Sequence, residues 1–323
     1  MLRKAIIVAA VWVLASAGAA AASIYNYETY WTNELDDTYY QYVPDKRIVG
    51  GNDACVAVPV IGSNSQYVHV DNTLWYKEFD ADGNVLQMYY VYSLMVGEYY
   101  SRIYGFDMAG DTPWFSYEWW LDYAKTRMPA YYSAINIGRT YMVTGKSTNY
   151  FQSLAAVQGT DYYYCWRKYA GAYRLCKMKG ANVVSYFTPP GNVWDVVTDS
   201  AGTVYLADGN EVLKYRDDGT LLAEWAAPQP IMDLSLDSQS RVLALCEDKY
   251  TYVYDAGGAF LGSFTGPYAV DIYSAAVGPG DKYFVLGYKT AYLTWDTIYM
   301  YRFAPSMTNI RPASLGRIKA MFQ

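Results

Sequence analysis

The sequence predicts an all-β protein built from repeated four-stranded antiparallel units, and three observations support this. Asp195, Asp233 and Asp271 follow one another at intervals of 38 residues, each beside a short apolar run. Between them, runs rich in Val, Leu and Tyr alternate with turns that contain Gly, Asp or Asn. The chain of 323 residues also contains 38 tyrosines, a residue type enriched in strands. A four-stranded unit repeated about every 40 residues is typical of a β-propeller blade.

The first 22 residues have the three consecutive regions of a secretory signal peptide. Arg3 and Lys4 precede an apolar run over residues 5–14, and small residues then continue to Ala22. The apolar run is about half as long as the roughly 20 residues that span a bilayer. We therefore expect cleavage near Ala22 and a secreted, periplasmic or cell-surface protein with no transmembrane segment. The chain has no Asn-x-Ser/Thr sequon, which favours a bacterial source.

The repeats divide the remaining chain into an aromatic N-terminal arm (23–51), a propeller domain (52–305) and a C-terminal tail (306–323). We expect six blades, with seven as the alternative. The predicted blades are 52–90, 91–152, 153–190, 191–228, 229–268 and 269–305. The second of them is long and irregular. The last lacks a clear fourth strand, and because an open ring would expose sheet edges, we expect Ile24–Trp31 to supply it.

Blade 191–228 carries three motifs: Asp199-Ser-Ala-Gly202, Val204-Tyr-Leu-Ala-Asp208 and Tyr215-Arg-Asp-Asp-Gly219. In these motifs it resembles the NHL-repeat family of propellers. Residues 230–266 keep the same frame but have Cys246 in the place of Asp208. The resemblance covers roughly a third of the chain. It implies a six-bladed propeller and specifies the fold better than the function.

The acidic residues suggest a site in the central channel. The net charge of −6 argues against a nucleic-acid partner, because neutralising phosphates needs a basic surface. Asp195, Asp233 and Asp271 are expected to begin innermost strands, whose ends point at the channel mouth. Together they could bind a divalent cation or a hydroxyl-rich ligand. The alternative is that each carboxylate accepts a hydrogen bond from a neighbouring backbone N–H. We assign no metal ligand and no cofactor.

The four cysteines of an exported protein indicate disulfides before metal ligands. A hairpin centred between Ala170 and Gly171 would place Cys165 opposite Cys176, and we predict a disulfide between them. Cys55 and Cys246 fall in blades that are not neighbours, so no second bond is predicted. The chain has no Cys-x-x-Cys-His motif, which excludes covalent haem.

The single histidine limits the catalytic alternatives. Residues 47–51, Arg-Ile-Val-Gly-Gly, look like the activation site of a trypsin-like protease, but the chain has no Gly-Asp-Ser-Gly-Gly motif. His69 is the only histidine, so a zinc site built on a histidine cluster is excluded too. We interpret residues 47–51 as a loop and His69 as structural.

Two further segments are candidate binding surfaces. The predicted hairpin 166–179 is basic, and it could dock an anionic polymer or an acidic partner; the alternative is a solvated hairpin. Its candidate residues are Arg167, Lys168, Arg174 and Lys177. Trp119 and Trp120, with the tyrosine pairs nearby, suggest an aromatic surface, since adjacent strand residues face opposite sides.

These observations favour an exported, non-catalytic binding or assembly module that holds a protein or polysaccharide partner by aromatic-rich propeller surfaces. The main alternative is a metal-dependent, lactonase- or lyase-like propeller hydrolase with its site in the central channel. A third hypothesis is self-assembly on the cell surface, in which the arm Ile24–Tyr42 adds a strand to another copy.

Overall fold

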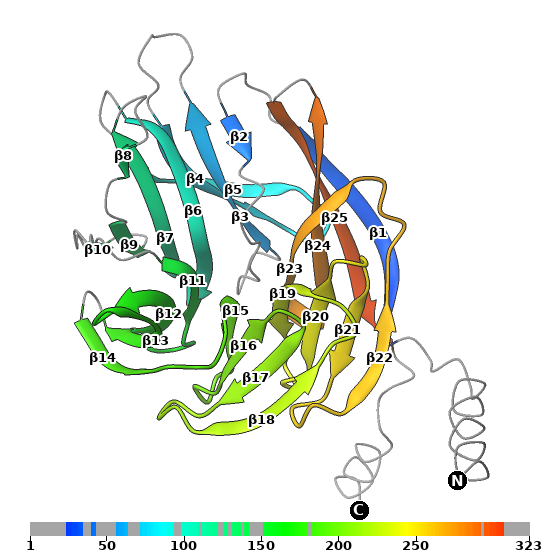
Figure 1. The fold of residues 1–323 in the computed structure, drawn as a ribbon. Coiled ribbons are helices and arrows are strands. Elements are labelled where there is room, and N and C mark those ends of the chain that lie inside the picture. The colour runs from blue at the N-terminus through cyan, green and yellow to red at the C-terminus, as the bar shows by residue number, and fades with distance from the viewer. Residues whose placement is uncertain are drawn as a thin grey trace, which may run out of the picture.

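The protein consists almost entirely of β-strands (Figure 1). The computed structural model describes residues 24–34, 40–42, 56–63, 72–93, 98–109, 112–121, 126–127, 131–136, 139–141, 151–179, 182–291 and 294–306. The one helical element in these ranges is the 3-10 turn Pro279–Asp281. None of the described residues forms a helix with the length and hydropathy needed to cross a bilayer.

The described strands form six antiparallel sheets. The first contains β2 (Tyr40–Tyr42), β3 (Val56–Ser63), β4 (Asn72–Phe79) and β5 (Val85–Ser93). The second contains β6 (Glu98–Ala109), β7 (Thr112–Leu121), β9 (Tyr131–Asn136) and β10 (Arg139–Tyr141), with β8 (Thr126–Arg127) paired to β7. The third contains β11 (Phe151–Ala156), β12 (Tyr162–Tyr169), β13 (Ala172–Lys179) and β14 (Asn182–Phe187).

The other three sheets are more regular. They contain β15 (Val193–Thr198), β16 (Val204–Asp208), β17 (Glu211–Tyr215) and β18 (Leu221–Ala226); then β19 (Ile231–Leu236), β20 (Val242–Cys246), β21 (Thr251–Tyr254) and β22 (Phe260–Phe264). The last contains β23 (Asp271–Val277), β24 (Tyr283–Ala291), β25 (Thr294–Pro305) and β1 (Tyr25–Glu34). The prediction of four-stranded antiparallel units is therefore confirmed.

The sheets are arranged radially, as in a β-propeller (Figure 1). Strand β6 packs against β11, β11 against β15, β15 against β19 and β19 against β23. The first sheet contacts both of its neighbours, through β2 with β25 and through β4 with β6. It begins at Tyr40, inside the segment that the sequence analysis assigned to the N-terminal arm. The five sheets from β6 to β23 thus meet at their inner strands, whereas the first sheet also uses β4, its third strand.

The core lies between neighbouring sheets, and β16 shows how the sequence produces it. Val204 and Leu206 point toward the β11–β14 sheet and pack with Trp166. Tyr205 and Ala207 point the opposite way, toward the β19–β22 sheet. Alternate residues of a strand face opposite sides of the sheet. Because both faces are covered, β16 reads as a continuous apolar run, not as an alternation with polar residues.

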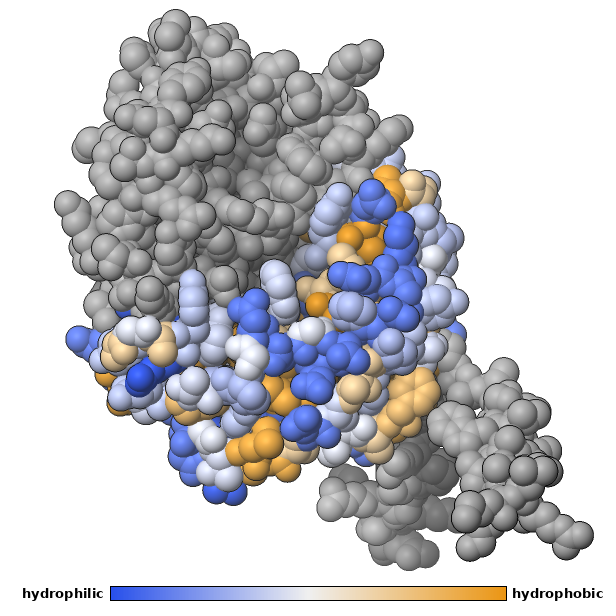
Figure 2. Space-filling model, viewed as in Figure 1, coloured by the Kyte–Doolittle hydropathy of each residue, from blue (hydrophilic) through white to orange (hydrophobic). Residues whose placement is uncertain are grey.

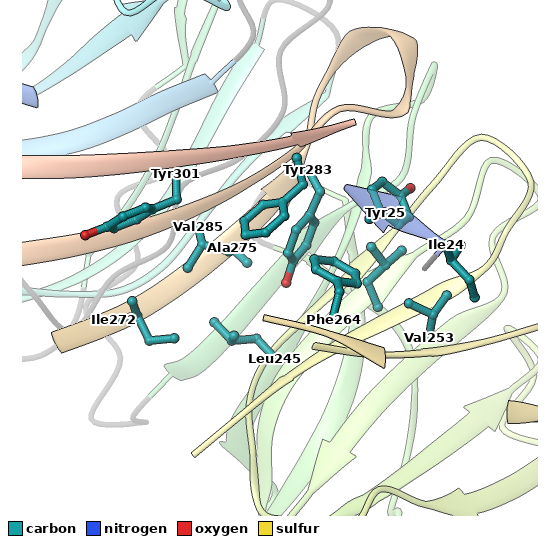
Figure 3. Close-up of a cluster of buried hydrophobic side chains, with 12 residues drawn as sticks. Ile24, Tyr25, Leu245, Val253, Phe264, Ile272, Ala275, Tyr283, Val285 and Tyr301 are labelled. Atoms are coloured by element: carbon teal, nitrogen blue, oxygen red, sulfur yellow. The ribbon is translucent and has the colours of Figure 1, made fainter. Parts of the chain in front are cut away.

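Strand β1 completes the last sheet. It pairs antiparallel with β25, from Tyr25 opposite Pro305 to Glu34 opposite Thr297. The ring of Tyr25 stacks on Phe264 with 5.2 Å between centroids, inside the cluster shown in Figure 3. Ring closure led us to expect the segment Ile24–Trp31 in this place; its residues 25–31 lie in β1, and Ile24 directly precedes the strand. A strand from one end of the domain thus covers the edge left by the other end.

The recurring turn aspartates have a local structural role. The Oδ1 atom of Asp199 accepts hydrogen bonds from the backbone N–H groups of Ala201 at 3.0 Å and Thr203 at 2.8 Å. Asp80, Asp237 and Asp255 bind the second and fourth following N–H groups in the same way. These bonds satisfy turn donors that have no partner in the sheet. Three of these aspartates are in Asp-x-x-Gly and Asp237 is in Asp-x-x-Ser, and all four stabilise the turns of their hairpins.

Aromatic rings on the outermost strands pack against hairpin glycines of the neighbouring sheets. A Cβ atom on Gly258 would lie 2.6 Å from Cε3 of Trp225, which belongs to the preceding sheet. Phe187 covers Gly219 in the same manner, and Trp31 of β1 covers Gly83. The three glycines have φ angles of +88°, +86° and +88°, which favour glycine. Strand β1 therefore packs a ring on a hairpin glycine of the next sheet, just as β14 and β18 do.

We expect the substitution Gly258→Ala to lower the free energy of unfolding by about 2–4 kcal/mol, from left-handed backbone strain plus the overlap with Trp225. Gly202→Ala is the matched control, because Gly202 has φ +80° with no atom within 4 Å of an added Cβ. It should cost only about 1 kcal/mol. Urea unfolding of both variants measures the difference, and equal losses would show that the ring contact does not matter.

Candidate functional site

Two of the predicted channel aspartates connect neighbouring sheets. Asp195 on β15 is fully buried, and its Oδ2 accepts a hydrogen bond from the N–H of Leu234 on β19 at 2.7 Å. Asp233 on β19 is also buried, and its Oδ2 accepts from the N–H of Ala275 on β23 at 2.9 Å and from the Ser274 hydroxyl. These carboxylates hold inner strands together, as the structural alternative predicted.

Other polar side chains of the inner strands form similar connections. Asp107 on β6 accepts from the N–H of Ala156 on β11 at 2.7 Å. The hydroxyl of Thr198 on β15 donates to the Ala156 carbonyl, also at 2.7 Å. A buried charge is costly unless it is hydrogen-bonded, and these contacts supply such bonds to Asp107, Asp195 and Asp233. These polar side chains of the inner strands therefore form hydrogen bonds that connect neighbouring sheets.

Asp271 does not join the other two aspartates, which corrects the prediction of three converging carboxylates. It is exposed and forms an ion pair with Lys249 at 3.3 Å. The register explains why: each inner strand has a bulge, and the residue that follows it is Asp195, Asp233 or Ser274. The residue equivalent to the two buried aspartates is therefore Ser274. Among the residues that the structure describes, no three His, Cys, Asp or Glu side chains are grouped to hold a metal.

The bulges place a different side chain at the start of each inner strand. Trp194, Met232 and Tyr273 are the extra residues in β15, β19 and β23. Trp194 is 63% exposed, although Val193 and Asp195 on either side of it are buried. Bulges redirect side chains and occur often beside binding sites. The sequence analysis missed these residues; the available signal is the large apolar residue that directly precedes Asp195 and Asp233.

The basic residues of the β12–β13 hairpin do not form one patch. Arg167 and Arg174 are cross-strand partners, and the Arg174 guanidinium lies 4.4 Å from the centre of the Tyr186 ring. Lys177 points to the other face, where its Nζ lies 3.1 Å from the Asp217 carboxylate of the next sheet. The side chain of Lys168 is outside the described residues. These contacts of Arg174 and Lys177 are with other parts of the same molecule.

The predicted disulfide is absent from the structure. Cys165 lies opposite Cys176, but both are buried free thiols. The two-residue turn at Ala170 and Gly171 is closed by a hydrogen-bonded pair, and pair types alternate along the ladder, so the cysteines also occupy a hydrogen-bonded pair. Cβ atoms are farther apart there than a disulfide requires.

Burial also raises the pKa of both thiols. Burial raises the pKa of Cys176 to about 11, so the thiolate that would attack a disulfide or a metal is scarce at neutral pH. Cys246 is a third buried free thiol, on β20. Cys55 and His69 lie outside the described residues. Trp119 and Trp120 belong to β7, opposite Ser101 and Tyr100, and their side chains are likewise outside the described part.

A row of aromatic rings, two of them exposed, runs from the β19–β22 sheet to β18. We call this row the aromatic strip. Its members are Tyr250, Tyr252, Phe260, Tyr254 and Trp225. Centroids of successive rings are separated by 6.3, 6.4, 5.8 and 6.0 Å. Tyr250 is 42% exposed and Phe260 is 59% exposed, whereas Tyr254 is buried. The strip is thus open to solvent at one end and anchored in the core at the other.

Alternation along β21 places these rings on one side. Tyr252 and Tyr254 point toward the β15–β18 sheet, while Val253 points into the cluster with Phe264. Phe260 joins the row because it lies directly opposite Tyr254 in the register. On the face shown in Figure 2, the hydrophobic residues of the described part form separate patches among hydrophilic ones. The sequence analysis did not identify this strip.

A carboxylate lies at the exposed end of the aromatic strip. Oδ2 of Asp248 accepts a hydrogen bond from the Tyr252 hydroxyl at 2.7 Å, and Oδ1 accepts from the N–H of Tyr250 at 3.1 Å. Desolvation by burial and the Asp248 carboxylate raise the pKa of Tyr252, so its phenol stays a neutral donor. The strip therefore combines flat apolar faces with a fixed acceptor.

Comparison with known proteins identifies the class of fold. No family model and no curated protein sequence matches the chain. Its structure is similar to Raptor of Chaetomium thermophilum, with a TM-score of 0.51 and 10% identity over 82% of this chain and 28% of that one. Two others are the WD40 β-propeller domain of Doa1 (TM-score 0.49, 12% identity, 88% and 98% covered) and a chain of a nidogen/laminin complex (0.48, 12%, 68% and 84%). The chain has a β-propeller fold.

Proposed function

We propose that this protein is an exported, non-catalytic binding module that holds a protein or glycan partner on an aromatic surface of its propeller. The observation that carries the proposal is the aromatic strip, where Tyr250 and Phe260 stand exposed above a buried ring. Large exposed apolar side chains that lie together mark interaction sites more often than scattered ones do. Binding of a partner accounts for the exposure of Tyr250 and Phe260 without a catalytic step.

We also propose that the ring has six blades and is similar to NHL-repeat propellers. The six sheets contact one another in a closed succession, with β1 completing the last. The turn chemistry of Asp199, Asp237 and Asp255 supports the NHL-type repeat, because each aspartate holds its hairpin in the same way.

The hydrolase alternative has weaker support. A catalytic metal needs several oxygen ligands that turn toward one point. Asp195 and Asp233, the carboxylates best placed for this, instead accept hydrogen bonds from neighbouring sheets. The self-assembly hypothesis also has weaker support. It requires the N-terminal arm to add a strand to another copy, but β1 of that arm pairs with β25 of its own chain. We therefore favour the binding of a separate partner.

The test has two parts. The mature protein is sized by light scattering and analysed for metals; we expect a monomer without a stoichiometric divalent ion. A stoichiometric metal whose removal abolishes a lactonase or lyase activity would replace the proposal by the hydrolase, and large ordered assemblies would replace it by self-assembly. The protein is then mixed with isolated cell envelopes of the producing organism. We expect retention that Phe260→Ala weakens, and the absence of retention would contradict the proposal.

A further inference from the structure

We infer that the aromatic strip binds a β-linked polysaccharide chain, with pyranose rings stacked on Tyr250, Tyr252 and Phe260. The inference rests on the proposed function and names the ligand class for the same site. Sugars joined by equatorial β-linkages form extended chains with flat C–H faces and hydroxyl edges. The strip offers the complement of both features, as the following contacts show.

The apolar part of the site is rigid. Phe260 packs on Tyr254, and the Tyr254 ring contacts Trp225. Trp225 in turn packs on Gly258, in the turn between β21 and β22. Tyr252 is fixed by its hydrogen bond to Asp248. Rings held in this way lose little conformational entropy when a ligand stacks on them. The row is therefore preorganised and presents several ring faces to one extended ligand.

The polar part of the site suits hydroxyl groups. Each oxygen of Asp248 already accepts one hydrogen bond, from Tyr252 or from Tyr250, and a carboxylate oxygen has room for a second. A sugar hydroxyl can donate a hydrogen bond to this carboxylate. A purely apolar ligand would leave the carboxylate unused, and a nucleic acid would be repelled by it.

The size of the strip favours a sugar chain over a folded protein. An aromatic side chain has about 150–250 Å² of surface. At 42% and 59% exposure, Tyr250 and Phe260 together offer roughly 200 Å². A stable protein interface buries about 800 Å² on each partner. The exposed rings alone fall well short of such an interface, whereas a few stacked sugars can cover them.

The experiment uses cellohexaose and chitohexaose, the β-linked chains of glucose and N-acetylglucosamine, in calorimetric titrations of the full mature protein. We expect at least one of them to bind and α-linked maltohexaose, which is not flat, to bind much more weakly. Phe260→Ala and Tyr250→Ala should each weaken binding about tenfold, since they remove a stacking surface. Asp248→Asn should weaken it several-fold. Val184→Ala, at an exposed position on β14, is the matched control and should have no effect.

The outcomes separate this inference from the proposed function. If neither β-linked hexamer binds, or if Phe260→Ala and Val184→Ala bind like the unmodified protein, the strip is not a β-glycan site. Retention on cell envelopes would still support a binding module with a different partner. Phe260 is mostly exposed, so its substitution should leave the fold intact, and circular dichroism of each variant checks this.

Discussion

Replacing Tyr25 by alanine should destabilise the folded protein by about 3–5 kcal/mol, as expected for the loss of a large buried ring. The Tyr25 side chain is 1% exposed. It packs against Phe264 and Tyr283, with centroid distances of 5.2 and 6.1 Å, and its hydroxyl donates to Asp237 at 3.3 Å. The truncation leaves a cavity and also loosens β1 from the rest of the ring.

Two companion variants show where this energy comes from. Tyr30→Ala lies in the same strand, but its ring is 53% exposed, so it should cost less than about 1 kcal/mol. Tyr25→Phe keeps the ring and removes only the hydrogen bond to Asp237, which should cost about 1 kcal/mol. Urea unfolding followed by circular dichroism compares the three. Similar losses for Tyr25→Ala and Tyr30→Ala would mean that β1 is not anchored through its first residue.

The second large effect is alkaline unfolding. Burial raises the pKa of Tyr205 and of Tyr254 to about 12, from the ordinary value of 10.0. It raises the pKa of Tyr25, Tyr163 and Tyr283 as well. Above pH 10 these groups are ionised in the unfolded chain but protonated in the folded one, so the folded state binds more protons. Stability is therefore fully present below pH 10 and falls as the pH rises further.

The fall should be steep, because each such tyrosine contributes about 1.4 kcal/mol per pH unit. Thermal unfolding measured from pH 8 to pH 12 should show the midpoint dropping sharply above pH 10. Tyrosinate absorbance recorded on the same samples should rise together with the loss of structure. If all 38 tyrosines instead ionise near pH 10 while the circular dichroism is unchanged, the buried rings are more accessible to solvent than the structure indicates.

The sequence predicts the local units well because their determinants are local. Turn aspartates such as Asp199 and Asp255 act on the next few residues, so the strands between them can be located from the sequence. Asp271 was misplaced because the 38-residue period is not exact: all three inner strands have the same bulge, but residues 227–230 precede β19 whereas the longer segment 265–270 precedes β23. The equivalent position is Ser274, three residues later.

Side-chain environments were harder to predict than elements. The positions of Cys165 and Cys176 follow from the hairpin, but whether they bond depends on the type of cross-strand pair they occupy. The aromatic strip escaped notice because Phe260 meets Tyr254 only through a register shift at β22. Its exposure depends further on how two sheets pack, which no spacing in one strand reveals.

The position of β1 has a consequence for how the protein folds. Pairing Tyr25 with Pro305 closes a loop of 280 residues, whereas the hairpins close loops of a few residues. Loop closure of this length costs about 3 kcal/mol more in entropy than that of a ten-residue loop. That cost falls once the intervening blades have formed and brought the two ends together. Strand β1 is synthesised long before β25 and cannot pair until β25 has been made. A nascent chain therefore cannot complete its ring before translation has passed β25.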